Sequence, residues 1–173
     1  FSVNYLGANI TQVGLNFSRP AAQILAQYYN FIRLGFEGYK EVHENSMTIA
    51  RYCHEAIGQM PCFENYSKDI VNPLFIWTMK PEYEKSAKWT LFDLQDKLMQ
   101  QGWMVPAYTM PKDIEDMVVM RIVVRQGMSR DMADMLIADI ADAVAELEKL
   151  EYPTPSRIAA QQAEKCKGKV FTH

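Results

Sequence analysis

The hydrophobic pattern is clearest between Met117 and Leu150, where an apolar run leads into a long amphipathic segment. Residues Met117 to Val124 are apolar and rich in β-branched side chains, apart from Arg121, and this favours a strand. After Ser129, apolar residues recur at three- and four-residue steps and predict one buried helix stripe: Met132, Leu136, Ile140, Ala143 or Val144, and Leu147. A strand that leads into such a helix is typical of a helix packed on a sheet.

The ends of this helix carry suitable residues. Ser129 is a good N-cap, although Met132 three positions later leaves the capping box incomplete. Asp131 and Asp134 near the start and Lys149 near the end suit the helix dipole.

A second long helical pattern runs from Pro20 to about Ile57 and predicts a helix that is kinked or interrupted near Gly35 and Gly38. Ser18 is suited to cap its start, and Pro20 to occupy its first turn. Residues 1–16 predict two short strands around a glycine-bearing turn at 6–9. This segment is too short to form a hydrophobic core of its own and is expected to pack against another structural element.

Between these regions the pattern predicts a strand at Pro73–Met79, a helix from Trp89 or Thr90 to Gln101, and a strand at Trp103–Tyr108. Leu91, Leu94 and Leu98 are expected on the buried side of that helix. Connecting segments are predicted at Gly58–Asn65, Glu82–Lys88 and Pro111–Glu115, and an extended tail after Leu150. The order of elements predicts an α+β layer, in which a small mixed or antiparallel sheet carries helices on one face and the long helix covers the sheet or leads into it.

Composition narrows the class of protein. The 173 residues suffice for one sizeable domain, and 49% hydrophobic with 23% charged residues is ordinary for a soluble globular protein. A net charge of -3 disfavours nucleic acid as a partner, and no apolar run has the length needed to span a membrane. The odd number of cysteines, Cys53, Cys62 and Cys166, lacks metal-ligand spacing, so we expect free thiols in a reducing, cytoplasmic setting and no metal.

Arg121 allows two interpretations. It either points to solvent from an edge strand, or it faces a pocket in which its planar fork binds a carboxylate or phosphate. The strand pattern alone favours the solvent-facing arginine, because alternate strand positions commonly face water. The sequence contains no glycine-rich phosphate loop and no convincing Ser-His-Asp arrangement.

Six collinear blocks resemble a known family, and they cover nearly the whole chain except for weaker similarity at 61–72 and 152–168. The blocks are NYLG (4–7), NFSRPA (16–21), QYYNFIRLG (27–35), LFDLQDKL (91–98), GWMVPAYTM (102–110) and VVMRIVVRQG (118–127). They resemble the C-terminal part of bacterial glutamate decarboxylase, a pyridoxal-phosphate enzyme similar in fold to aspartate aminotransferase.

The resemblance implies conversion of L-glutamate to 4-aminobutanoate and CO2, with pyridoxal phosphate as the electron sink. It implies four parts: the end of the large domain with a hairpin (1–19), a long linking helix (20–58), a small α+β domain (59–151) and a tail (152–173). It also implies a cytoplasmic lyase that forms homo-dimers or higher homo-oligomers and serves acid resistance. No lysine here has the family's Ser-x-His-Lys context, so we expect part of a longer protein that lacks the Schiff-base lysine and is inactive alone.

The resemblance also implies roles for particular residues. Arg121 matches the arginine that binds the substrate's α-carboxylate, which reverses the preference from pattern alone. Ser18 matches a serine that reaches the cofactor phosphate across a dimer interface, a role compatible with an N-cap because helix N-termini bind anions. Tyr5 and Leu6 match the tip of a hairpin over the partner's active site, or form an ordinary exposed turn. His173 matches a tail histidine that closes the site at neutral pH, or is a solvated terminus.

Two alternatives stay open at this stage. One is a regulatory or oligomerisation module that has the fold without the chemistry. The other is a related decarboxylase with a different amino-acid substrate, since the residues that recognise the substrate side chain are expected upstream. The tail lacks a tryptophan and a dense basic run, so calmodulin is not expected as a partner.

Overall fold

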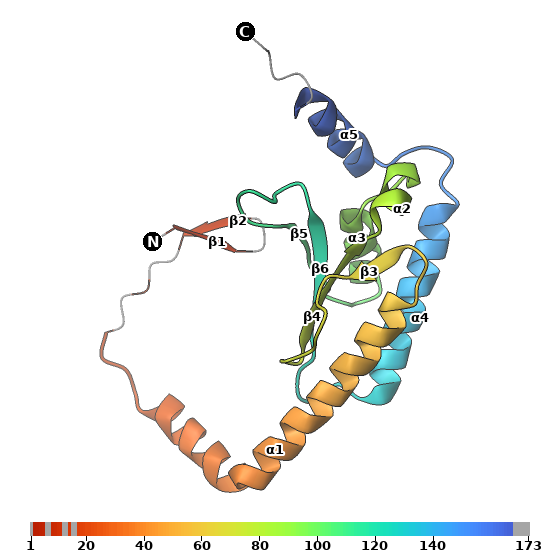
Figure 1. Ribbon diagram of the computed structural model, residues 1–173. Coiled ribbons are helices and arrows are strands. Elements are labelled where there is room, and N and C mark those ends of the chain that lie inside the picture. The colour runs from red at the N-terminus through yellow and green to blue at the C-terminus, as the bar shows by residue number, and fades with distance from the viewer. Residues whose placement is uncertain (1, 6–7, 12–13, 15–16, 168–173) are drawn as a thin grey trace.

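The computed structural model describes residues 2–5, 8–11, 14 and 17–167, and it places a four-stranded sheet against helices (Figure 1). A separate hairpin is formed by β1 and β2. The elements in chain order are β1 Ser2–Tyr5, β2 Ala8–Thr11, α1 Ala22–Gly58, β3 Phe63–Asn65, β4 Leu74–Met79, α2 Pro81–Ser86, α3 Leu91–Gln100, β5 Ala107–Thr109, β6 Val118–Val123, α4 Arg130–Glu148 and α5 Pro155–Lys167.

The larger sheet has the strand order β3-β4-β6-β5, and all neighbouring strands are antiparallel. This confirms the α+β prediction and selects the antiparallel option. Phe75 of β4 pairs with Ile122 of β6, and Ile76 pairs with Arg121. Because β6 lies between β4 and β5, the edge-strand interpretation that the pattern alone favoured for Arg121 was wrong.

One face of the sheet forms the core. Phe75 and Trp77 of β4 and Met120 of β6 are fully buried on this face, which α1, α3 and α4 cover. Side chains alternate between the faces of a strand, so the paired positions of β4 and β6 point the same way. The predicted buried side of α3 is confirmed, since its three leucines are at most 2% exposed: Leu91, Leu94 and Leu98.

Helix α1 consists of two halves with different surroundings. At Gly35 the backbone has φ 58° and ψ −169°, which interrupts the helix where the glycines predicted a break. This φ favours glycine because it brings no Cβ into conflict with the backbone. The second half packs on the sheet through Ile49, Ala50, Cys53 and Ile57.

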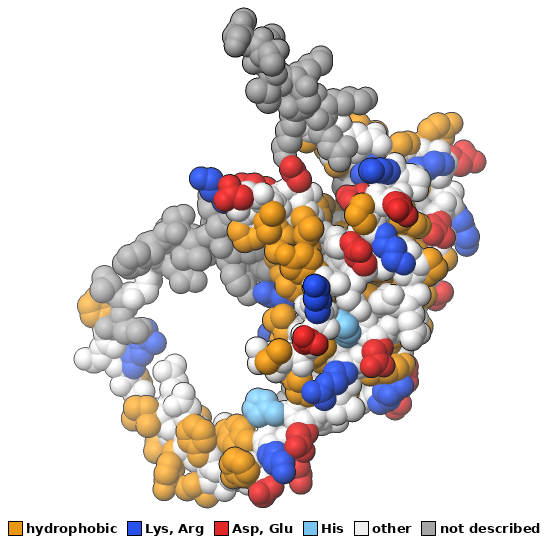
Figure 2. Space-filling model, in the orientation of Figure 1, with side chains coloured by type: hydrophobic (Ala, Val, Ile, Leu, Met, Phe, Trp, Pro, Cys, Tyr) orange, Lys and Arg blue, Asp and Glu red, His pale blue; other side chains and the backbone are white. Residues whose placement is uncertain are grey.

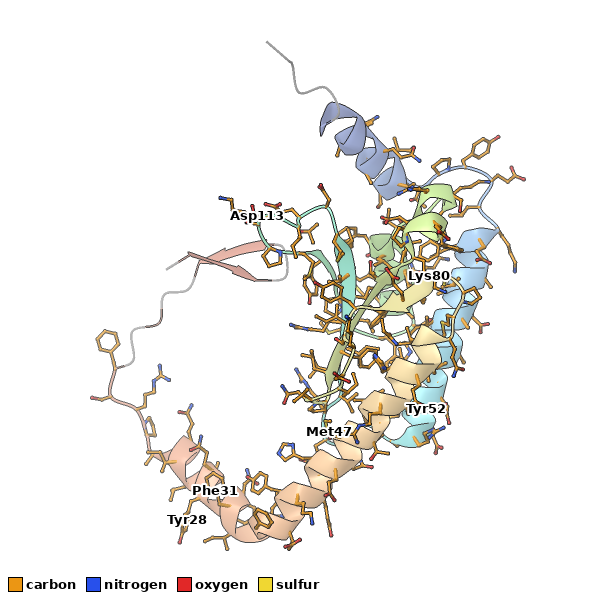
Figure 3. The ribbon with its side chains drawn as sticks, viewed as in Figure 1. Tyr28, Phe31, Met47, Tyr52, Lys80 and Asp113 are labelled. Atoms are coloured by element: carbon orange, nitrogen blue, oxygen red, sulfur yellow. The ribbon has the colours of Figure 1, made fainter. Side chains whose placement is uncertain are left out.

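The first half of α1 extends away from the sheet, as Figure 1 shows. Its large apolar side chains are 61–69% exposed, and they form much of the orange surface on this arm in Figure 2; Tyr28 and Phe31 are labelled in Figure 3. A helix that is apolar on all sides is normally buried. The exposed apolar residues are Ile24, Leu25, Tyr28, Tyr29, Phe31 and Ile32.

Helix α4 begins as predicted. The Ser129 hydroxyl accepts a hydrogen bond from the backbone N–H of Met132 at 3.1 Å, which satisfies one free donor of the first turn. The predicted buried stripe is confirmed from Leu136 to Leu147 but wrong at Met132, which is 41% exposed. Ala133 is buried in its place, because the three-residue step to Leu136 continues the stripe through position 133.

Two short-range predictions were wrong because prolines start helices here. The predicted loop at Glu82–Lys88 overlaps α2, in which Pro81 occupies the first turn and acidic residues follow it. The predicted extended tail contains α5, which begins at Pro155. The Thr154 hydroxyl accepts a hydrogen bond from Arg157 N at 3.2 Å, and Thr154 also bonds to Asp93 Oδ2 at 2.9 Å.

The remaining differences also arise from tertiary contacts. β3 forms within the predicted connecting segment Gly58–Asn65, because Phe63 pairs with Met79 and buries its ring in the core. The strand predicted at Trp103–Tyr108 is present only as Ala107–Thr109. The predicted cap at Ser18 is absent, since Ala21 is the N-cap residue of α1 and no side chain caps it.

Candidate carboxylate-binding site

Arg121 projects from the sheet face that the core helices do not cover. Its neighbours Met120 and Ile122 are buried in the core, so alternation directs Arg121 to the opposite face. Its backbone is held on both sides, by the pairing with Ile76 and by a hydrogen bond from Arg121 N to the Pro106 carbonyl at 3.2 Å. The arginine is therefore attached to the centre of the sheet and is only partly exposed.

The side chain of Arg121 lines an open hollow of about 470 Å³, here named the Arg121 hollow. The hollow lies between α3, the segment that leads into β5, and the second half of β6. Its other lining residues are Gln95, Met99, Met104, Val105, Pro106, Val123 and Arg125. An apolar lining with a few polar groups is typical of sites for small molecules.

One polar contact fixes the wall of the hollow. The Gln95 side-chain oxygen accepts a hydrogen bond from Ala107 N at 2.7 Å, which joins α3 to the first residue of β5. Gln95 thereby helps to hold the adjoining segment against α3. This residue had no signal in the sequence, because its partner is known only from the fold.

The electrostatics of the hollow suit an anion. Its described lining residues include two arginines, Arg121 and Arg125, and no aspartate or glutamate. The Arg121 Cζ atom lies 5.8 Å from the centroid of the Tyr108 ring, within the range of a cation–π contact. A planar guanidinium beside an apolar wall can bind a carboxylate through two parallel hydrogen bonds.

Of the other predicted site residues, Ser18 is described in full, and it is not among the residues that line this hollow. Ser18 is exposed in the non-helical segment before α1, and Tyr5 is the last residue of β1, where its backbone pairs with Ala8. Leu6 and His173 lie outside the described residues. The proposed roles of these four residues stay predictions. Arg125 was missed as a site residue, although its four-residue spacing from Arg121 on an extended chain indicates the same face.

The cysteines and histidines show no arrangement for metal binding in the part of the chain that the structure describes. Cys53 and Cys62 are buried thiols, and burial raises the pKa of each to about 11. His54 contacts the Ser67 carbonyl through Nε2 at 2.8 Å, and its ring packs edge-on against Phe75. Among the described helices, none combines the length and apolar character needed to cross a bilayer.

Comparison with solved structures defines the class of protein. Glutamate decarboxylase of Lactobacillus brevis superimposes on 87% of this chain with a TM-score of 0.74 and 37% identity, over 34% of its own length. The sphingosine-1-phosphate lyase of Burkholderia pseudomallei covers the whole chain with a TM-score of 0.61 at 18% identity, a likeness of fold alone. The chain has the fold of the pyridoxal-phosphate-dependent decarboxylases and lyases.

Comparison with curated sequences defines the family. Glutamate decarboxylase 5 of Arabidopsis thaliana is 46% identical over 92% of this chain, and glutamate decarboxylase of Aliivibrio fischeri is 46% identical over 83%. The matched region is 31% of each relative, so the chain spans about a third of their length. No family model matches. Over most of its own length, the chain is similar to glutamate decarboxylases, of which it matches about a third.

Proposed function

We propose that this chain is the C-terminal part of a glutamate decarboxylase, a lyase that converts L-glutamate to 4-aminobutanoate and CO2. The proposal is supported by relatives that carry this name and match the chain over most of its length. The observation that carries it is the position of Arg121 in a hollow where no carboxylate is found among the described lining residues. Such a hollow suits a substrate that must be bound by its α-carboxylate.

Arg121 binds the α-carboxylate in this proposal. Its guanidinium offers a rigid set of donors that matches the two oxygens of a carboxylate. The apolar residues around it, such as Met99 and Val123, lower the exposure of the ion pair to water. The segment that Gln95 holds forms one side of the hollow.

The described residues fit only part of a pyridoxal-phosphate site. No lysine lines the Arg121 hollow, so the group that would bind the cofactor covalently is assigned to another part of a longer protein. The exposed Ser18 hydroxyl fits a hydrogen bond to the phosphate, across a homo-dimer interface. Pyridoxal phosphate supplies the electron sink for the loss of CO2. The chain alone is therefore expected to be inactive.

The division into parts belongs to the same proposal. Residues 1–19 would form the end of a large domain, and 20–58 would form a helix that links it to the small domain. Residues 59–151 would form the small domain, and 152–173 the tail. The exposed apolar residues on the first half of α1 support a linking role, because a longer protein would cover them. Tyr5 and Leu6 would cover a partner's active site, and His173 would close the site at neutral pH. The cytoplasm is the proposed location.

The test uses the longer polypeptide that contains this chain, loaded with pyridoxal phosphate. We expect it to release CO2 from L-glutamate, and Arg121→Lys to lower kcat/KM by the equivalent of about 2–4 kcal/mol, since lysine keeps the charge but loses the planar fork. Arg51→Gln, on the exposed side of α1, serves as the control for loss of an arginine. No release of CO2 from glutamate would refute the activity, and unchanged kinetics in Arg121→Lys would remove Arg121 from the site.

A further inference from the structure

We propose that Arg125 is a second anion-binding residue of the Arg121 hollow, and that it attracts and positions the ligand by charge while Arg121 binds the carboxylate by geometry. The expected ligand is a small carboxylate or dicarboxylate. The inference rests on the proposed function for the identity of the substrate, but the two-arginine site itself can be tested without catalysis.

The backbone places the two arginines on the same side of the chain. Val124 N donates a hydrogen bond to the Pro73 carbonyl at 2.8 Å, so pairing with the chain before β4 continues beyond Val123, the last residue of β6. Along an extended strand, positions 121, 123 and 125 share a face, and Arg121 and Arg125 are separated by about 13 Å at their Cα atoms. Two long side chains can approach one small ligand from that separation.

Arg125 also borders a second hollow of about 380 Å³, here named the Trp103 hollow. This second hollow lies toward the start of α4 and includes Trp103, Met128 and Met132, whereas Arg121 lines only the first hollow. Arg125 is exposed at the junction of the two. This position suits a residue that a ligand meets before it reaches Arg121.

Arg125 lies in a basic part of the described surface. Among the residues that the structure describes, no aspartate or glutamate lines either hollow. The ion pairs of Lys97 with Glu146 and of Arg130 with Asp134 do not include Arg125. The local positive charge contrasts with the net charge of -3 for the whole chain. A cleft lined by one sign of charge concentrates ligands of the opposite sign.

The two arginines should therefore respond differently to substitution. An exposed charge acts through water, where the screening length is about 8 Å at physiological salt, so the effect of Arg125 should weaken as salt is added. Its effect should fall on ligand capture and hence on KM, with kcat unchanged. A lysine should preserve ligand binding at position 125, because only charge is needed there. It should not preserve binding at position 121, where the planar guanidinium is needed.

The experiment compares Arg125→Gln, Arg125→Lys and the control Arg51→Gln in the longer holoenzyme. We expect Arg125→Gln to raise KM for L-glutamate about threefold to tenfold at low salt, at the low end of electrostatic steering effects, with a smaller rise at 0.5 M NaCl. Arg125→Lys and Arg51→Gln should keep the original KM. An unchanged KM in Arg125→Gln, or equal losses in the glutamine and lysine variants, would overturn the inference.

Calorimetric titration with glutarate separates this inference from the proposed function. Glutarate is a dicarboxylate without the amino group, so its binding requires no turnover. Weaker glutarate binding in Arg125→Gln but not in Arg125→Lys would support the anion site even if glutamate were not decarboxylated. If glutamate is decarboxylated but Arg125→Gln changes neither KM nor the Kd for glutarate, the inference fails and the proposed function stands.

Discussion

The indole N–H of Trp103 donates a hydrogen bond to the carboxylate of Asp139, with 2.6 Å between Nε1 and Oδ2. This contact joins α4 to the segment between α3 and β5. Met104, Val105 and Pro106 follow Trp103 directly and border the Arg121 hollow. A contact on the far side of the segment therefore helps to define the hollow.

Replacement of Trp103 by phenylalanine should destabilise the fold by about 1–3 kcal/mol, because the part-buried Asp139 carboxylate loses its donor. Urea unfolding of Trp103→Phe, Asp139→Ala and the double variant measures the coupling between the two residues. The two single effects should not add in the double variant. Simple additivity would show that the hydrogen bond contributes nothing to stability.

The two serines that precede helices should behave differently. Ser129→Ala removes the cap of α4 and should cost about 1 kcal/mol, since the Met132 N–H loses its acceptor. Ser18→Ala is the matched control and should leave the unfolding free energy unchanged, because Ser18 does not cap α1. Equal losses from both substitutions, measured by urea unfolding, would contradict this account.

Arg157 should determine whether α5 stays attached. Its side chain is only 4% exposed, and Nη2 donates hydrogen bonds to the Glu84 and Lys85 carbonyls at the end of α2. Arg157→Met keeps the apolar stem but loses these bonds, so the opening free energy of α5 should fall by about 1.5–3 kcal/mol. Amide hydrogen exchange in α5 measures the effect.

The control for this experiment is Gln162→Met, on the exposed side of the same helix. It should leave exchange in α5 as it was. Unchanged protection in Arg157→Met would show that the helix is held by other contacts.

The contact between α1 and α4 predicts a pH dependence. The Tyr52 hydroxyl donates a hydrogen bond to Asp134, which lowers the pKa of that carboxyl and raises the pKa of Tyr52; Figure 3 labels Tyr52. Because the carboxyl pKa is lower in the folded state, this group stabilises the fold above the unfolded pKa of about 4. That stabilisation is lost as the pH falls through the folded pKa. Because the tyrosine pKa is higher in the folded state, the hydroxyl stabilises the fold below the unfolded pKa of about 10. That stabilisation is lost as the pH rises through the folded pKa.

Tyr52→Phe should therefore be less stable than the original chain near pH 6, and the difference should shrink below about pH 4. Chemical unfolding at several pH values measures it. A difference that stays constant from pH 6 to pH 2 would show that the two groups are not linked.

Local signals in the sequence determined much of the framework. The leucines of α3, the Ser129 cap and the glycine break in α1 were predicted correctly, because each depends on neighbours a few residues away. The family resemblance also came from the sequence, since long collinear blocks carry it. Local reasoning failed at α2 and α5, where a proline in the first turn starts a helix and had been taken to indicate a loop or an extended chain.

Features that depend on residues distant in the sequence were decided only by the tertiary structure. β3 exists because Phe63 pairs with Met79, a register that no local pattern contains. The strand pattern alone favoured an edge strand for Arg121, because the pattern cannot show that β4 and β5 lie on either side of β6. The sequence alone determined that an arginine interrupts an apolar strand. Burial of its neighbours in the core, and the position of Gln95 and Met99 of α3 at the same hollow, decided that this arginine lies beside Arg125.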